Sequence, residues 1–286
     1  MLWFYLAATS VIFFAFLNLL QRKLSVASSD PRSLAVVFNS IAAIFAFLYF
    51  VVSGGFGDAK LPQDRESWFY ILFALLAFGM YERFRFHVAK MLDASIFTIV
   101  GNVSILVAFI GALFLYSETL TTAKLFGSLL ILIALFLVGK VAAKGAKGST
   151  KGVLWGMGIS IILGLGWMLD KKGAESFGPN LYNVLVWSLP TFIILLPSIK
   201  LAPVLATLKT SWKQISLMAF LNMSGYLMQL KAVSLSEATK VIPVVQTSTL
   251  ATVVLGIFLL KETDNIVLKI VSGALALMGV YLLVAF

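Results

Sequence analysis

Long apolar stretches, separated by short polar segments, follow one another along the whole chain of 286 residues. A run of about 20 apolar residues forms a helix long enough to span the hydrocarbon core of a bilayer. Ten stretches approach that length, at residues 3–20, 33–52, 68–88, 94–116, 123–138, 152–169, 181–199, 211–230, 238–260 and 266–286. The pattern predicts an all-α integral membrane protein with ten transmembrane helices and short connections.

The composition supports a membrane protein and narrows the chemistry. Hydrophobic residues make up 60% of the chain and charged residues 12%, whereas a soluble domain has about 25% charged residues. The chain contains no cysteine and a single histidine, His87. Disulfide frameworks, thiolate metal sites and histidine metal cages are therefore excluded or strongly disfavoured. We expect no catalytic residues, no metal and no cofactor.

Polar landmarks recur along the chain at an offset of 144 residues (262 − 118). The recurring elements are Ser117-Glu118-Thr119 with Lys261-Glu262-Thr263, Trp68 with Trp212, and Asp93-Ala94-Ser95 with Glu237-Ala238-Thr239. The spacing predicts two five-helix repeats at residues 1–141 and 152–286, joined by a linker at 142–151. Because five is odd, the second repeat enters the membrane from the opposite face. Such inverted repeats are typical of secondary transporters, with the substrate site between the halves.

These motifs resemble the ten-helix EamA type of the drug/metabolite transporter superfamily. The resemblance rests on two apolar helices that each close in Glu before a Gly-containing helix, at 113–120 with Gly127 and at 257–263 with Gly273. The two Ala-hydroxyl pairs and Pro243 also fit, whereas Ile99 departs from the pattern at the place equivalent to Pro243. The resemblance implies a multi-pass carrier of small metabolites, commonly an exporter, that works by alternating access.

Two amides inside the predicted helices are the first candidates for a substrate site. Asn102 and Gln246 occupy equivalent places in the two repeats (246 − 102 = 144). An amide both donates and accepts hydrogen bonds, so it can hold a polar or zwitterionic solute without a buried charge. The alternative is that these amides join neighbouring helices, as amides in membranes also do.

Further polar and aromatic residues inside the spans extend this candidate site. A polar group in hydrocarbon is costly unless it is paired or faces water. Amides beside aromatic rings suit an amphipathic ligand, although each residue could instead serve helix packing. These additional candidates are Asn18, Asn39, Trp167, Asn183, Trp187, Asn222 and Tyr226.

The third predicted helix carries an unusual cluster of ionisable groups near its end. Tyr81 and Glu82 are candidates for substrate binding, and Glu82 and Arg85 are spaced to pair on one helix face. One interpretation is that an arginine of this cluster holds a substrate carboxylate, or that Glu82 or His87 couples transport to protons. The other places Arg85 and His87 at the membrane interface, where arginine extends toward water.

Four functional classes fit a multi-pass membrane protein. The leading hypothesis is a secondary transporter that moves small polar or amphipathic metabolites, such as amino acids, across the membrane. A proton-coupled multidrug transporter or lipid-carrier flippase of the same superfamily is the alternative, but residues 3–20 lack the acidic residue expected there. A membrane-integral enzyme or a channel is disfavoured, because no catalytic cluster, charged ring or carbonyl filter is visible.

The net charge of +10 reflects basic residues at the ends of apolar runs. Such residues face phospholipid headgroups, so the lipid bilayer and a small-molecule substrate are the expected partners, with no nucleic acid. We expect a monomer or weak homodimer in the cell (inner) membrane of a prokaryote. Fifteen of the 22 Lys and Arg residues follow odd-numbered helices. The positive-inside rule then places both termini outside the cell, whereas the family resemblance implies cytoplasmic termini.

Overall fold

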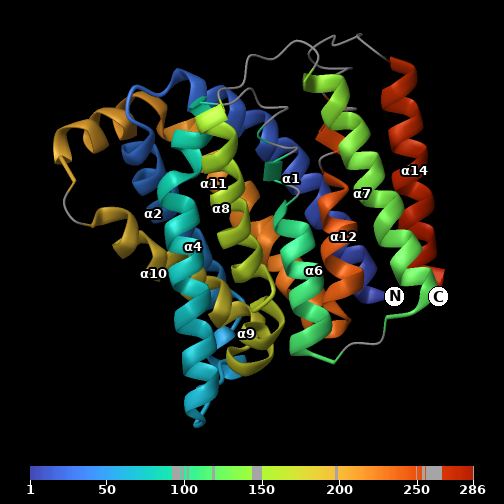
Figure 1. Ribbon diagram of the computed structural model, residues 1–286. Coiled ribbons are helices and arrows are strands. Elements are labelled where there is room, and N and C mark those ends of the chain that lie inside the picture. The colour runs from blue at the N-terminus through green and yellow to red at the C-terminus, as the bar shows by residue number, and fades with distance from the viewer. Residues whose placement is uncertain are drawn as a thin grey trace.

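The computed structural model (Figure 1) describes residues 1–91, 97, 100–101, 103–117, 120–143, 150–196, 199–248, 250–252, 255 and 266–285. Within these residues the chain is helical and has no strand. The helices are α1 (Leu2–Ala27), α2 (Pro31–Val52), α3 (Gly55–Asp58), α4 (Arg65–Met91), α6 (Val103–Leu115), α7 (Thr122–Ala143), α8 (Thr150–Trp167), α9 (Asp170–Phe177), α10 (Pro179–Leu195), α11 (Leu201–Leu235), α12 (Ala238–Gln246) and α14 (Ile266–Ala285).

Eight of the ten predicted spans correspond to these helices. The predicted spans at 94–116 and 238–260 are described only in part, by α6 and α12, and their remaining residues lie largely outside the described part of the chain. Among the described residues, α1 and α2 are long and apolar enough to cross a bilayer, and α6, α10 and the Thr122–Ala134 part of α7 are shorter apolar helices. The predicted start at residue 211 is wrong, because α11 begins at Leu201. Pro203 does not prevent this start, because proline is tolerated in the first turn. The short helices α3 and α9 lie in segments predicted to be connections.

The start of α2 and the end of α10 are held together by charged and polar groups. Asp30 caps α2, and its carboxylate accepts a hydrogen bond from the Arg32 backbone N–H at 3.1 Å. The Arg32 guanidinium reaches across to α10, where Nε donates to the Ile194 carbonyl at 3.0 Å. Arg83 on α4 donates to the Ile193 carbonyl at 2.8 Å. Cationic donors at a helix C-terminus satisfy its last carbonyls, so these two arginines stabilise the end of α10.

The helix packing is symmetric under exchange of the two halves. When the two halves are exchanged, α1 takes the place of α8, α2 of α10, α4 of α11, α6 of α12 and α7 of α14. Accordingly α1 packs on α11 as α8 packs on α4, and α2 packs on α11 as α10 packs on α4. The contact of α1 with α12 likewise matches that of α8 with α6. The halves are therefore structural repeats.

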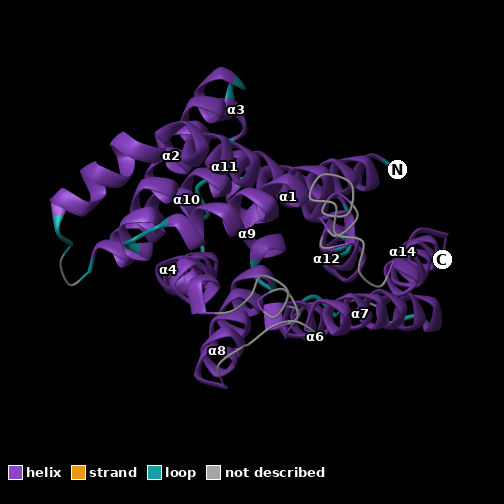
Figure 2. Cartoon of the chain, turned by 90° about the horizontal axis from the view of Figure 1, so that it is seen from above, coloured by secondary structure: helices purple, strands orange, loops and turns teal. Residues whose placement is uncertain are grey.

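The two repeats have opposite directions. Figures 1 and 2 show α7 and α14 side by side, and Figure 1 shows that they run in opposite directions. Both chain termini lie at the same, lower end of the bundle in Figure 1. The axis relating the repeats is therefore perpendicular to the helices, which places it in the membrane plane as expected for inverted repeats.

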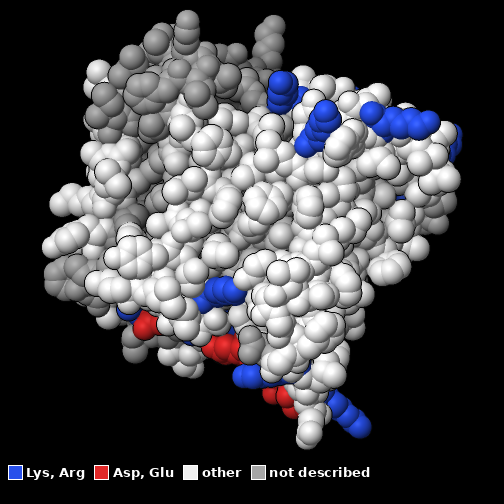
Figure 3. Space-filling model, turned by 180° about the vertical axis from the view of Figure 1, so that it is seen from behind, with Lys and Arg blue, Asp and Glu red and all other residues white. Residues whose placement is uncertain are grey.

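Large apolar side chains cover much of the outer surface, including Phe69, Phe126 and Phe192 at 65%, 55% and 64% exposed. On the face shown in Figure 3, Lys, Arg, Asp and Glu gather toward the upper and lower ends, and the middle is largely uncharged. A soluble protein rarely exposes so large an apolar area. This uncharged middle therefore matches the hydrocarbon core of a bilayer.

A glycine contact sets the distance between the halves at the centre of the bundle. A Cβ added to Gly164 of α8 would lie 2.6 Å from the Ser104 carbonyl oxygen and from the Val107 Cβ of α6. Small residues let membrane helices approach closely. Gly164 thereby brings α8 and α6 together beside the cavity described next.

Candidate functional site

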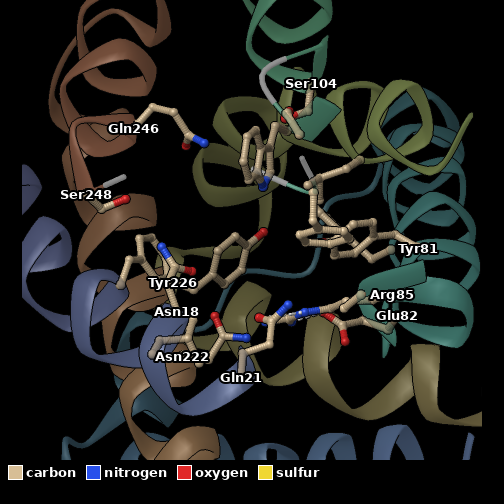
Figure 4. Close-up of a pocket in the computed structure, with 18 of the residues that line it drawn as sticks. Asn18, Gln21, Tyr81, Glu82, Arg85, Ser104, Asn222, Tyr226, Gln246 and Ser248 are labelled. Atoms are coloured by element: carbon tan, nitrogen blue, oxygen red, sulfur yellow. Dashed lines mark hydrogen bonds and ion pairs between the residues drawn. The ribbon is translucent and has the colours of Figure 1, made fainter. Parts of the chain in front are cut away.

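A cavity of about 560 Å³ lies between the two halves. Its walls come from α1, α4, α6, α8, α10, α11 and α12, together with Phe97, Gly101 and Ser248 (Figure 4). The volume falls within the range of small-molecule sites, roughly 300–1,000 Å³. Eight of the eleven predicted substrate-binding residues line it, namely Asn18, Tyr81, Glu82, Trp167, Trp187, Asn222, Tyr226 and Gln246.

The other three predicted residues are not part of the described wall. Asn39 is fully buried behind it, where its Nδ2 donates to the Ala35 carbonyl at 3.0 Å and to Glu82 Oε2 at 3.4 Å. Asn183 is also buried, and its Oδ1 accepts a hydrogen bond from Trp187 Nε1 at 3.1 Å. These two amides orient cavity residues from behind. Asn102 lies outside the described residues.

One side of the cavity is a buried ion pair. Arg85 Nη1 lies 2.7 Å from Glu82 Oε1, and the two residues are 4% and 6% exposed. Arg85 Nε donates to Gln21 Oε1 at 3.1 Å, and Nη2 donates to the same oxygen. Figure 4 shows Gln21 reaching from α1 toward this pair. The Arg85 side chain is thus buried and paired and does not extend toward water, whereas His87 is exposed and is not among the lining residues of the cavity.

Aromatic rings enclose the Arg85 guanidinium. The guanidinium carbon lies 5.2 Å from the Phe86 ring centroid, 5.3 Å from that of Phe38 and 5.8 Å from that of Tyr81. Cation–π contacts stabilise a desolvated cation. The aromatic side chains thus help to hold a positive charge away from bulk water.

A second group of rings forms the deeper wall. Tyr226 packs edge-on against Trp187 and Phe78, with centroid distances of 6.0 Å in both cases. The hydrogen bond from Trp187 to Asn183 fixes the indole. The result is an apolar surface of defined shape next to the ion pair.

Amides complete the wall facing the ion pair (Figure 4). Asn18 Nδ2 donates to Thr252 Oγ1 at 3.2 Å. Within the described part of the chain, the side chains of Asn222 and Gln246 make no hydrogen bond. Because an amide carries two donors and an acceptor, both groups are available to a solute.

The cavity reaches the surface at one end of the bundle. Val26, at 68% exposed, and Lys90 and Met91 line it where α1 and α4 end. These helix ends lie at the upper end in Figure 1. The cavity is therefore accessible from the end opposite the chain termini.

Contacts between the halves close the other end. The Tyr116 hydroxyl donates to the Met168 carbonyl at 2.6 Å and accepts from the Lys172 backbone N–H at 3.2 Å. Lys124 at the start of α7 forms an ion pair with Glu237 just before α12. These contacts join the two halves at the end opposite the opening.

The cavity residues occupy related places in the two repeats. Phe78 pairs with Asn222 and Glu82 with Tyr226 at an offset of 144 (222 − 78 and 226 − 82). Asn18 pairs with Trp167 and Gln21 with Asp170 at an offset of 149 (167 − 18 and 170 − 21). The cavity thus lies around the axis that relates the halves, where inverted-repeat transporters hold their substrate.

Sequence reasoning missed Gln21, and it considered Arg85 for a carboxylate site as only one of two interpretations. Gln21 ends the first apolar stretch and precedes two basic residues, so it reads as part of a loop. The alignment of Gln21 with Asp170 in the other repeat could have identified Gln21. The three-residue spacing of Arg85 from Glu82 indicated their pairing.

Comparison with known families identifies the fold. The model of the EamA-like transporter family matches residues 1–140 and 150–285. The chain belongs to this family. EamA-like proteins are integral membrane transporters, so the protein is a membrane transporter of small solutes, and the resemblance seen in the sequence is confirmed.

Solved structures support the same fold. A crystal structure described only as that of a protein superposes with a TM-score of 0.73 at 13% sequence identity, covering 99% of this chain and 96% of that chain. At this identity the likeness concerns the fold alone. None of the curated proteins compared with the chain matches it. Within the described residues, no group of His, Cys, Asp and Glu could hold a metal ion.

Proposed function

We propose that the protein is a secondary transporter that exports zwitterionic amino acids and related amphipathic metabolites by alternating access. The observation that carries this proposal is the placement of a buried Glu82–Arg85 ion pair beside an aromatic wall within one cavity. Its setting is the cell membrane of a prokaryote.

The ion pair matches the two charges of a zwitterion. The Arg85 guanidinium can bind a carboxylate through two parallel hydrogen bonds, and Glu82 can accept from an ammonium group. Gln21 Oε1 accepts hydrogen bonds from Arg85, and the guanidinium can exchange this amide for a solute carboxylate. Because the pair has no net charge, a neutral zwitterion enters without leaving an unpaired charge behind.

The remainder of the cavity accommodates an uncharged side chain. Trp187, Tyr226 and Phe78 offer ring faces and edges, while Asn222 and Gln246 offer hydrogen bonds. Apolar walls with a few polar groups are typical of small-molecule sites. This combination favours amphipathic over fully polar solutes.

The symmetric halves supply a route for alternating access. Contacts at Tyr116 and Lys124 close one end while the other is open. An exchange of conformation between the two repeats would close the open end and separate these contacts. Solute in the central cavity would then face the other side of the membrane.

The test is counterflow in proteoliposomes that contain the purified protein. Vesicles loaded with unlabelled amino acids are diluted into a labelled mixture of the protein amino acids, and trapped label is measured. We expect label to accumulate with wild type and with Lys23→Gln, an exposed control, and to fall to the level of empty vesicles with Arg85→Ala. Equal uptake by Arg85→Ala and wild type, or none by wild type, would overturn the proposal.

A further inference from the structure

A buried carboxyl group lies directly behind the cavity wall. Asp170 begins α9 and is 1% exposed. Its Oδ1 accepts hydrogen bonds from the Tyr226 hydroxyl at 2.6 Å and the Tyr182 hydroxyl at 3.2 Å. Its Oδ2 is buried without a hydrogen-bond partner among the described residues. A carboxylate in such surroundings is costly unless a proton or a cation neutralises it.

The groups around Asp170 do not provide that neutralisation. Packed against α9, α10 contributes Tyr182 and α11 contributes Tyr226, while Tyr116 follows α6 nearby. The lysines of α9 itself lie over other rings, Lys171 over Tyr116 at 5.1 Å and Lys172 over Tyr70 of α4 at 5.8 Å. In the described part of the chain, no ion pair includes Asp170.

The geometry around Asp170 depends on a glycine. A Cβ added to Gly173 would lie 2.2 Å from the Tyr182 ring, so only glycine lets that ring pack against α9 at its present distance. The close approach keeps the Tyr182 hydroxyl within reach of Asp170. The carboxyl is thus held by two tyrosines, one of which also lines the cavity.

Tyr226 provides the connection between Asp170 and the solute. Its ring lines the cavity and packs against Trp187 and Phe78, and its hydroxyl bonds to Asp170 Oδ1. A charged carboxylate only accepts hydrogen bonds, whereas a protonated one also donates. A change of protonation at Asp170 therefore alters the hydrogen bond that positions a cavity side chain.

We propose that Asp170 carries the proton that drives transport, and that Tyr226 transmits its protonation state to the cavity. The step is proton binding to a carboxylate oxygen from one side of the membrane and its release to the other, with no other bond made or broken. The inference rests on the proposed transport function and adds its coupling ion. It assigns coupling to Asp170 rather than to Glu82, whose charge Arg85 already balances.

Infrared spectroscopy tests proton binding without any solute. Difference spectra of the full-length protein, recorded between acidic and basic pH, should contain a protonated-carboxyl band that is absent in Asp170→Asn. The matched control is Glu175→Gln, because Glu175 is an exposed acid on the same helix. An unchanged band in Asp170→Asn would refute the proposal.

Transport under an imposed gradient tests coupling. One pH unit supports about tenfold accumulation of label from the amino-acid mixture at one proton per solute. Wild type and Glu175→Gln should accumulate label under a pH gradient and not under a sodium gradient. Asp170→Asn should lose accumulation but retain exchange of labelled for unlabelled solute. Accumulation of label that does not depend on the pH gradient, or that Asp170→Asn retains, would overturn the inference.

Two further variants keep the test decisive if Asp170→Asn does not fold. Tyr226→Phe and Tyr182→Phe each remove one donor that stabilises the carboxylate, so the infrared titration midpoint should move to higher pH. An unmoved midpoint in both would refute the assignment. Failure of counterflow in every protein, with the infrared result intact, would instead reject the proposed solute class and leave Asp170 as a proton site.

Discussion

The two halves of the molecule place a buried acid beside the same cavity but neutralise it differently. In the first half, Glu82 on α4 pairs with Arg85, and Gln21 from α1 completes the cluster. In the second half, Tyr226 occupies the position of Glu82, and Asp170 occupies the position of Gln21. There the acid receives two tyrosine hydroxyls and no cation from the described residues.

This difference suits the two acids to the two roles proposed above, solute binding and proton coupling. A closed ion pair offers both signs of charge to a zwitterion. A buried acid held by hydroxyl groups alone can change its charge, because no fixed cation opposes protonation. With the roles proposed above, divergence of one repeated cluster would provide a binding group and a coupling group on opposite sides of one axis.

The orientation of the chain in the membrane decides which end of the cavity faces the cytoplasm. A reporter fused to the chain answers this question with a signal that is either present or absent. On the face in Figure 3, the upper end shows only Lys and Arg, whereas the lower end shows both signs. The positive-inside rule then predicts that the upper, open end faces the cytoplasm, as an exporter that loads from inside would require. We expect no signal from a cytoplasm-only reporter fused after Phe286. A strong signal would favour the orientation implied by the family.

The largest graded effect is expected for Arg85→Lys. Lysine keeps the charge but cannot form two parallel hydrogen bonds with a carboxylate. Counterflow should fall by roughly 100-fold, about 2.7 kcal/mol of transition-state binding. Folding is checked by the elution profile in detergent. Activity within about threefold of wild type would show that Arg85 is structural, and the comparison of the clusters would fail.

A smaller effect is expected for Glu82→Gln. Removing one member of the pair leaves Arg85 uncompensated, so transport should fall by roughly 10–30-fold. The midpoint of its pH dependence should stay where wild type has it, because Asp170 sets that midpoint. If the midpoint moves in Glu82→Gln and stays in Asp170→Asn, the two acids have exchanged roles and our assignment is wrong.

The amides that line the cavity should contribute less to solute binding than the Glu82–Arg85 ion pair. Gln246→Ala removes hydrogen bonds to the solute worth about 1–1.5 kcal/mol, which predicts a five- to tenfold higher KM. Expression should stay near normal, since no hydrogen bond to a described residue is lost. A wild-type KM would remove Gln246 from the site.

The smallest effect tests the support of Asp170. Gly173→Ala forces the Tyr182 ring away from α9, and overpacking of this kind costs typically about 1–3 kcal/mol. The melting temperature in detergent should drop by a few degrees, whereas Gly158→Ala, where a Cβ meets nothing within 4 Å, should not lower it. Equal melting curves would show that the close packing at Gly173 is not required.

Much of the architecture was predictable from the sequence. A bilayer demands uninterrupted apolar runs of a set length, so the positions of α2, α8 and α14 follow from residue order alone. The repeat offset predicted the inverted halves, and polar groups inside spans directed attention to residues such as Asn18 and Gln246. These inferences concern single helices or the register of one repeat against the other.

The tertiary structure decided which of those polar groups meet. Lipid and helix contacts are both apolar, so the inward face of a membrane helix is only weakly marked in its sequence. The hydrogen bonds of Gln21 with Arg85 and of Asp170 with Tyr226 depend on how α1 packs near α4 and how α9 packs on α11. The sequence by itself determined the spans and their symmetry, and the packing of the helices determined the cavity, its open end and its two acids.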